Sequence, residues 1–122
     1  ISAPAIDAAK DTAIANNITN VEFLQGSSEK IFNNVKDLNL NMNETAVLID
    51  PPRKGCDEQF LSQLSDFQPK KIVYVSCDPS TQARDTRYIL NCGKGYKIRS
   101  ITPVDLFPQT RHIENIVCFV RD

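Results

Sequence analysis

The hydrophobic positions of this chain follow two spacings, one typical of helices and the other typical of strands. Apolar residues that repeat every third or fourth position predict helices at about 4–15, 31–38, 58–64 and 79–92. Short apolar or alternating runs predict strands at 21–24, 46–49, 72–75, 96–101 and 113–120. Because helices and strands alternate through most of the chain, the pattern predicts an α/β fold.

The last two predicted strands follow each other with no helix between them. Parallel neighbours need a crossover connection of about a dozen residues, so we expect these two strands to pair in antiparallel fashion. By contrast, the run at 46–49 is continuously apolar, which is typical of a parallel strand covered on both faces. The expected architecture is a three-layer, Rossmann-like α/β sandwich with a mostly parallel sheet and an antiparallel pair at its C-terminal end.

Short polar signals indicate where the third and fourth helices begin. Asp57 and Asp78 are of the residue type that caps helix N-termini, and Pro79 suits the first helical position. Gly93 is suited to the end of the fourth helix. These signals place the start of the fourth helix immediately after Cys77.

The composition is that of an ordinary globular domain. The chain has 122 residues, of which 41% are hydrophobic and 24% charged, and this excludes collagen-like and strongly disordered classes. No apolar run approaches the roughly 20 residues of a membrane span, and no basic segment precedes an apolar stretch as in a secretory leader. We therefore expect no membrane partner, and a cytoplasmic, organelle-matrix or nuclear location rather than secretion.

Charge is unevenly distributed between the two parts of the sequence. Residues 1–50 hold three basic and seven acidic side chains, whereas residues 51–122 hold eleven basic and eight acidic ones. A phosphate-bearing ligand would favour the second part, although so small an excess also occurs on ordinary solvated surfaces.

The four cysteines, Cys56, Cys77, Cys92 and Cys118, are not arranged in close pairs. Structural zinc sites use closely spaced cysteines and histidines, so we expect no metal. Since nothing in the sequence indicates export, the thiols are expected to be reduced.

Three residues with reactive side chains are predicted to meet at one edge of the sheet. Asp50 and Cys77 each follow a predicted parallel strand, and open α/β sheets bind ligands at the carboxyl ends of such strands. The final strand runs the opposite way, so Glu114 at its beginning is expected at the same edge. A thiol together with carboxylates suits nucleophilic catalysis with a separate base.

Each of these residues also has a simpler structural interpretation. Cys77 precedes a helix whose N-terminal amides favour the thiolate, but a cysteine at a strand end is commonly a small buried hydrophobe. Glu114 is either a solvent-facing strand end or a functional base, and Asp50 is either a turn residue or a ligand-binding carboxylate. The helix start directly after Cys77 favours the nucleophile interpretation of that residue.

Several neighbouring polar residues are further candidates. Arg53 and Lys54 bring positive charge to the turn after Asp50, where they would suit a phosphate or a developing enolate. Cys56 in the same loop is a second candidate thiol. His112 is either a proton shuttle or a residue that positions its loop.

Three motifs in combination resemble a known enzyme family. They are Asp-Pro-Pro-Arg-Lys-Gly at 50–55, Val-Ser-Cys-Asp-Pro-Ser-Thr at 75–81 with Arg-Asp at 84–85, and Asp-Leu-Phe-Pro-Gln-Thr at 105–110 with His-Ile-Glu at 112–114. The combination resembles the S-adenosylmethionine-dependent RNA uracil-C5 methyltransferases, in particular the branch that makes 5-methyluridine in the T-loop of transfer RNA. The helix and strand predicted within residues 1–26 also fit, so the resemblance covers nearly the whole chain.

The resemblance implies a class I methyltransferase fold, S-adenosyl-L-methionine as the cofactor and RNA, a transfer RNA, as the partner. It implies Cys77 as the nucleophile that adds to C6 of the uracil and Glu114 as the base that removes the C5 proton. Asp50 would contact the cofactor, and Ser27 would approach its adenine. Arg53 and His112 are then expected on the substrate side.

The resemblance also implies that residues 1–122 are the C-terminal portion of a catalytic domain. The family's RNA-binding region, Gly-rich cofactor loop and first strands would lie upstream, so we expect the isolated segment to be inactive. Two other functions stay open. An RNA cytosine-C5 methyltransferase would also use a cysteine, and Cys56 stands where the uracil family would have an aliphatic residue; the other function is a non-catalytic RNA-binding module.

Overall fold

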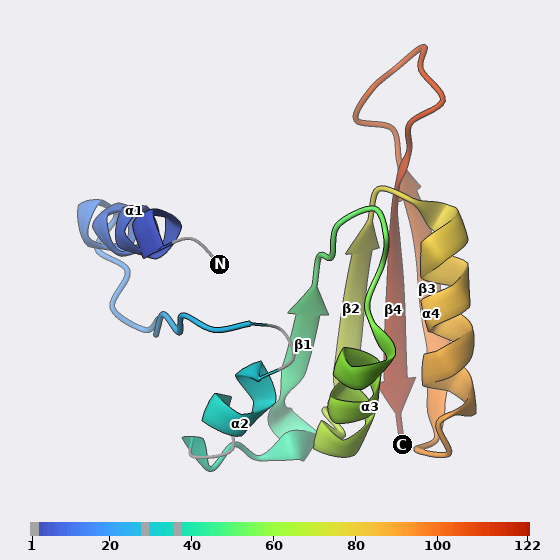
Figure 1. Cartoon of the computed structure of the whole chain (residues 1–122), viewed down its shortest axis with the longest axis horizontal. Helices are drawn as coiled ribbons and strands as arrows, with labels where there is room; N and C mark the ends of the chain where they lie inside the picture. The colour runs from blue at the N-terminus through green and yellow to red at the C-terminus, as the bar shows by residue number, and fades with distance from the viewer. Residues whose placement is uncertain (1–2, 28–29, 36–37) are drawn as a thin grey trace. The chain divides into compact units, whose positions relative to one another are not determined.

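The computed structural model describes residues 3–27, 30–35 and 38–122, apart from the side chains at 33 and 34. The chain divides into two compact units, Ile1–Asn39 and Leu40–Asp122. The second unit carries the sheet, drawn in green to red in Figure 1. All of the predicted site residues except Ser27 belong to it.

Among its described residues, the first unit has two α-helices, with an extended stretch at 21–27 between them. They are α1 (Ala3–Ala15) and α2 (Ile31–Val35), in agreement with the predicted helical spacing. Asn17, just after α1, has a left-handed backbone with φ of 54°, a conformation that stops a helix. The strand predicted at 21–24 is wrong, because residues 21–27 form neither helix nor strand. A strand is stabilised by ladder hydrogen bonds, and no described strand pairs with this segment.

The second unit is a four-stranded sheet with two long helices. Its elements in chain order are η2 (Met42–Glu44), β1 (Ala46–Ile49), α3 (Glu58–Phe67), β2 (Lys71–Ser76), α4 (Pro79–Asn91), β3 (Tyr96–Val104) and β4 (Glu114–Arg121). The N-cap residues Asp57 and Asp78 accept hydrogen bonds from the first turns of α3 and α4, as predicted from the sequence.

The strands are ordered β1-β2-β4-β3 in the sheet. β1 and β2 are parallel, whereas β4 is antiparallel to both of its neighbours, so the sheet is mixed. The predicted antiparallel pair is confirmed. Because β4 inserts between β2 and β3, its first residues lie against the last residues of β2, with Ser76 opposite Asn115.

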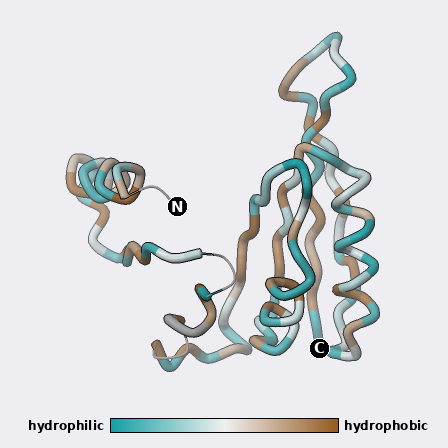
Figure 2. The backbone as a smooth tube through the Cα atoms, in the orientation of Figure 1, coloured by the Kyte–Doolittle hydropathy of each residue, from teal (hydrophilic) through white to brown (hydrophobic). Residues whose placement is uncertain are grey.

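Helices α3 and α4 cover the same face of this sheet (Figure 1). Along β2 every second residue is buried, and Ile72 and Tyr74 on the covered face have no exposed surface. Phe119 on β4, which pairs with Ile72, is also fully buried. Figure 2 shows that hydrophobic residues concentrate along the strands while α4 is largely hydrophilic, so the core lies between the sheet and the inner sides of the helices.

The opposite face and the outer edge of β1 are more open. Leu48 of β1 keeps 69% of its surface exposed, and Val73 and Cys118 beside it in the register are half-buried. β1 pairs on one side only among the described strands. No described helix is both long enough and apolar enough to span a membrane.

Candidate active site

The ends of three strands bring the predicted reactive residues to one edge of the sheet. Asp50 directly follows β1, Cys77 directly follows β2, and Glu114 is the first residue of β4. Ser76 pairs with Asn115, so Cys77 and Glu114 each lie one residue beyond this pair, at the same edge of the sheet. The strand ends thus bring the thiol and the carboxylate to one edge of the sheet, as predicted from strand direction, and their direct meeting stays a prediction.

A shallow cavity of about 260 Å³ surrounds Cys77. Its lining comes from the loop after β1, the start of α4 and the loop before β4, and consists of Arg53, Cys77, Asp78, Pro79, Arg111, His112 and Ile113. Two sequence candidates, Arg53 and His112, are thus brought to the thiol, and Arg111 adds a cation that was not predicted. Glu114 is not in this lining but follows Ile113, which is.

The turn that holds Cys77 is braced by its two neighbours. The backbone N–H of Asp78 donates to Ser76 Oγ at 3.0 Å, so the chain closes tightly around the intervening cysteine. The Asp78 carboxylate caps α4 by accepting from the N–H groups of Ser80 and Thr81. The hydrogen bond from the Ser80 hydroxyl is the largest cause that holds the pKa of Asp78 below its usual range. The two backbone N–H groups lower this pKa further, and the positive charge of Arg53 contributes least. The thiol therefore sits at the positive end of a capped helix.

Gln82 joins β2 and β4 directly behind this edge. Its side chain, which is 2% exposed, donates to the backbone oxygens of Tyr74 at 2.9 Å and Asn115 at 3.0 Å. In return, Asn115 Nδ2 donates to Gln82 Oε1 at 2.7 Å. One buried amide thus fixes the two strands that carry Cys77 and Glu114 at their ends.

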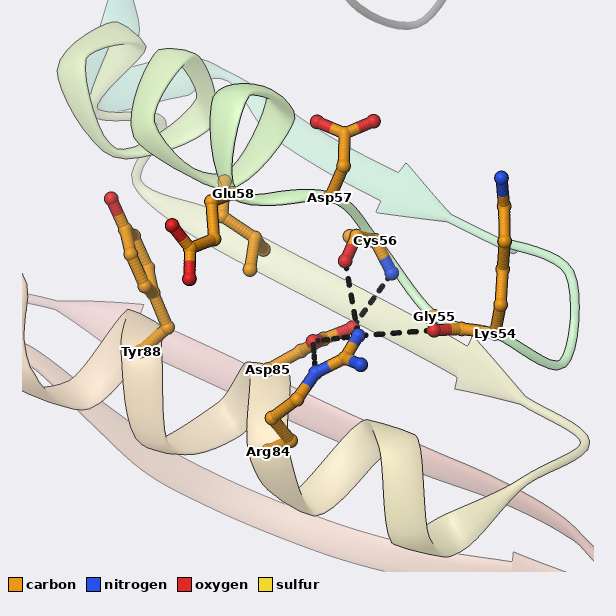
Figure 3. A pocket seen from close by; sticks show the side chains of 9 residues that line it. Lys54, Gly55, Cys56, Asp57, Glu58, Arg84, Asp85 and Tyr88 are labelled. Carbon is orange, nitrogen blue, oxygen red and sulfur yellow. Dashed lines mark hydrogen bonds and ion pairs between the residues drawn. The ribbon is translucent and has the colours of Figure 1, made fainter.

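Cys56 lies in a different cavity, between α3 and α4 (Figure 3). Burial is the largest cause that raises the pKa of this thiol from 9.0 to about 11, and the negative charge of Asp85 adds to it. Among the described residues, the lining of the cavity around Cys77 does not include Cys56. A protonated thiol outside that cavity does not suit the role of nucleophile.

The two predicted cofactor residues have different placements. Asp50 is exposed at the carboxyl end of β1, where a ligand above the sheet edge would meet it. Ser27 belongs to the first unit, at the end of the extended segment. Their roles toward a cofactor stay predictions.

Sequence reasoning missed the buried polar residues that organise this edge. Gln82 and Asp85 are buried on the inner side of α4 together with Ile89. The spacing of these three positions is that of one helix face, so two polar residues on the same face as Ile89 were a usable signal of buried polar contacts. Arg111 carried no such signal because it lies in an irregular loop.

The whole sequence matches a family model. Residues 1–122 match the model described as tRNA (Uracil-5-)-methyltransferase. The chain belongs to this family. It is 46% identical over 123 residues to the tRNA (uracil(54)-C(5))-methyltransferase of Schizosaccharomyces pombe, covering 99% of this chain and 23% of that protein. The Saccharomyces cerevisiae protein of the same name is 44% identical, with 99% of this chain and 19% of that protein covered.

A solved member of the tRNA (uracil-5-)-methyltransferase family shares the fold. The crystal structure of the Pyrococcus abyssi tRNA (uracil-54, C5)-methyltransferase, in complex with S-adenosyl-L-homocysteine, matches with a TM-score of 0.75 and 32% identity. The match covers 98% of this chain and 27% of that one. This chain thus spans about a quarter of its relatives, and the α/β fold predicted from the sequence is that of a family member.

Proposed function

We propose that the protein containing this chain transfers a methyl group from S-adenosyl-L-methionine to C5 of a uridine in the T-loop of transfer RNA, through a covalent bond between Cys77 and C6 of the base. The observation that carries the proposal is the strand register, in which Ser76 pairs with Asn115; it supports a thiol at a helix N-terminus and the Glu114 carboxylate acting at one edge of the sheet. The names of the relatives, which specify uracil 54 and C5, support the same reaction.

The residue types at this edge match what the reaction needs. Uracil C5 is a poor nucleophile, so addition of the Cys77 thiolate to C6 would shift negative charge to O4 and C5. When bound, S-adenosyl-L-methionine would supply the methyl electrophile for C5, and S-adenosyl-L-homocysteine would be the leaving product. Glu114 would remove the C5 proton, and the Cys77–C6 bond would break to restore the pyrimidine.

Positive charge around the thiol supports the RNA substrate. Arg53 and Arg111 line the cavity with Cys77, where their cations would lower the energy of the enolate and meet RNA phosphates. Bringing C5 and C6 to a recessed thiol requires the uridine to leave its stack, at a cost of about a few kcal/mol.

The exposed carboxylate of Asp50 fits the other side of the same reaction. It stands at the carboxyl end of β1, next to the strand that leads to Cys77, and a carboxylate there complements the positive charge of the cofactor. We assign Asp50 to holding the cofactor near the thiol, and Ser27 to the adenine side.

The cytosine alternative depends on Cys56, and the structure disfavours it. A thiol whose pKa is raised to about 11 is almost entirely protonated near neutral pH, and Cys56 lines the cavity between α3 and α4 rather than the cavity around Cys77. The non-catalytic alternative predicts RNA binding that does not depend on Cys77.

Trapping with RNA that contains 5-fluorouridine tests the proposal in the full-length enzyme. The fluorine at C5 cannot be removed as a proton, so the adduct between enzyme and RNA persists. We expect the wild-type enzyme and Cys56→Ala to form a denaturation-stable adduct and Cys77→Ala to form none. Adduct loss only with Cys56→Ala would refute the assignment, and T-arm binding without any adduct would support the non-catalytic module.

A further inference from the structure

The loop between β1 and α3 is fastened along its backbone by side chains of α4. Thr81 Oγ1 donates to the backbone oxygen of Arg53 at 2.9 Å. The guanidinium of Arg84 donates to the backbone oxygens of Lys54 at 3.0 Å and Cys56 at 3.1 Å. Three carbonyls of one short loop segment are therefore bound by two residues of a single helix.

Asp85 is the buried centre of this arrangement, with 1% of its surface exposed. Its Oδ2 accepts from the backbone N–H of Cys56 at 2.8 Å and from Tyr74 Oη at 2.7 Å, while Oδ1 accepts from Arg84 Nε at 2.9 Å. Figure 3 shows Arg84 and Asp85 together against the loop. The carboxylate thus binds the loop directly and also orients the arginine that binds it.

Gly55 shows how closely the loop is pressed against this carboxylate. A Cβ atom at position 55 would lie 2.6 Å from Asp85 Oδ2 and 2.8 Å from Arg84 Nη2. Its φ of 76° is also a conformation that favours glycine. The loop and α4 therefore fit each other at this point with no space for a side chain.

We propose that Asp85 is a positioning residue that holds Arg53 beside Cys77 by fixing the loop that carries Arg53. The proposal rests on the function proposed above. Arg53 lines the cavity around the thiol, and its carbonyl is bound to Thr81, one helical turn before Asp85. An anchored backbone lets the Arg53 guanidinium meet the negative charge that forms on the base without first being ordered. Asp85 itself does not line that cavity, so it acts through the loop.

The test is a double-mutant cycle in the full-length enzyme, read out as the single-turnover rate of adduct formation with 5-fluorouridine RNA. We expect Asp85→Asn to slow this step about 10- to 100-fold, the range caused by small misplacements at a reacting centre. In an Arg53→Met background, the same substitution should slow it less than about threefold, since the group that it positions is gone. An equal effect of Asp85→Asn in both backgrounds would overturn the proposal.

Ile89→Val serves as the matched control, because Ile89 is buried on the same side of α4 but near its other end. If Ile89→Val lowers the thermal midpoint of unfolding as much as Asp85→Asn does, its rate of adduct formation should still lie within about twofold of the wild-type rate. A loss as large as that of Asp85→Asn would mean that α4 stability alone matters, and the proposal would be wrong.

If Asp85→Asn does not fold, Thr81→Val carries the same cycle, since it deletes the bond to the Arg53 carbonyl while keeping the shape of the side chain. It should slow adduct formation in the wild-type background and not in Arg53→Met; equal slowing contradicts the inference. Failure of the wild-type enzyme to form an adduct at Cys77 would instead refute the proposed function, so the two failures are distinguishable.

Discussion

Gln82 of α4 and Asn115 of β4 are joined by two hydrogen bonds in opposite directions, one residue away from Glu114. Because Gln82 also binds the backbone of β2, the bonds connect the strand that ends before Cys77 to the strand that begins with Glu114. One buried amide therefore cross-links the two strands that carry the proposed nucleophile and base, in addition to their direct backbone pairing.

Replacing Gln82 by methionine should slow removal of the C5 proton more than formation of the adduct. The variant leaves the Asn115 amide without its acceptor, so the first residues of β4 become more mobile. Glu114 is then no longer held in place to reach C5 of the uracil. We expect kcat to fall about tenfold or more. Unlike the wild-type enzyme, the variant should accumulate a covalent complex with ordinary transfer RNA, visible on denaturing gels. Asn91→Ala, on the exposed end of α4, is the control and should show no such complex.

Cys56 should be nearly inert toward alkylation in the folded protein. With a pKa of about 11 instead of 9.0, about a thousandth of this thiol is ionised at pH 8, compared with about a tenth after unfolding. Mass spectrometry after iodoacetamide treatment should show that alkylation at Cys56 accelerates about 100-fold in urea from ionisation alone. The folded-state rate should keep rising until pH 11, and a plateau near pH 9 would contradict the assigned environment.

Tyr74→Phe should destabilise the fold more than Tyr96→Phe. Both hydroxyls are buried and each donates a bond of 2.7 Å, but Tyr74 donates to the Asp85 carboxylate and Tyr96 to the backbone oxygen of Pro69. Bonds to charged groups are stronger, so we expect a loss of about 1–3 kcal/mol for Tyr74 and about 0.5–1.5 kcal/mol for Tyr96. Urea denaturation would measure the difference from the midpoints of the two variants, provided that the unfolding free energy keeps the same slope against urea concentration. A larger loss of stability for Tyr96→Phe would contradict the prediction.

Ionisation of Asp78 should contribute to the dependence of folding stability on pH in the acid range. Its pKa is lowered in the folded state by the Ser80 and Thr81 bonds, so its ionised form stabilises the fold above the unfolded value of 3.8. This stabilisation is lost as the pH falls through 3.8 toward the folded pKa. Asp78→Asn should therefore melt below the wild type at pH 6, and the two melting temperatures should converge below pH 3.8. A constant difference down to strongly acid pH would argue against an ionised cap.

The parts of the fold that sequence predicted are those set by local pattern. The run Ala46–Ile49, the caps Asp57 and Asp78 and the antiparallel pair at the C-terminal end all appear where they were expected. The segment 21–24 has the alternation of a strand but does not form one, because a strand also needs a neighbour to pair with, and local pattern does not report on that.

The candidate site also has parts that the sequence predicted and parts that it did not. Strand direction was enough to predict that Cys77 and Glu114 share an edge, and motifs pointed to Arg53 and His112 beside them. The role of Asp85 could not be predicted, since two of its partners, the backbone N–H of Cys56 and the hydroxyl of Tyr74, lie far away in the chain and local pattern does not report on them. Long-range contacts of side chains with main chain carry no sequence signature.

The alternation of buried residues along β4 also fixes the position of Glu114 relative to Cys77. Val117 and Phe119 face the helices, so sliding β4 by one position would turn both toward the opposite face and expose them. That same slide would carry Glu114 away from the thiol. Hydrophobic packing of β4 thus also sets the alignment of the proposed nucleophile and base, because a misaligned strand is disfavoured during folding, before any ligand binds.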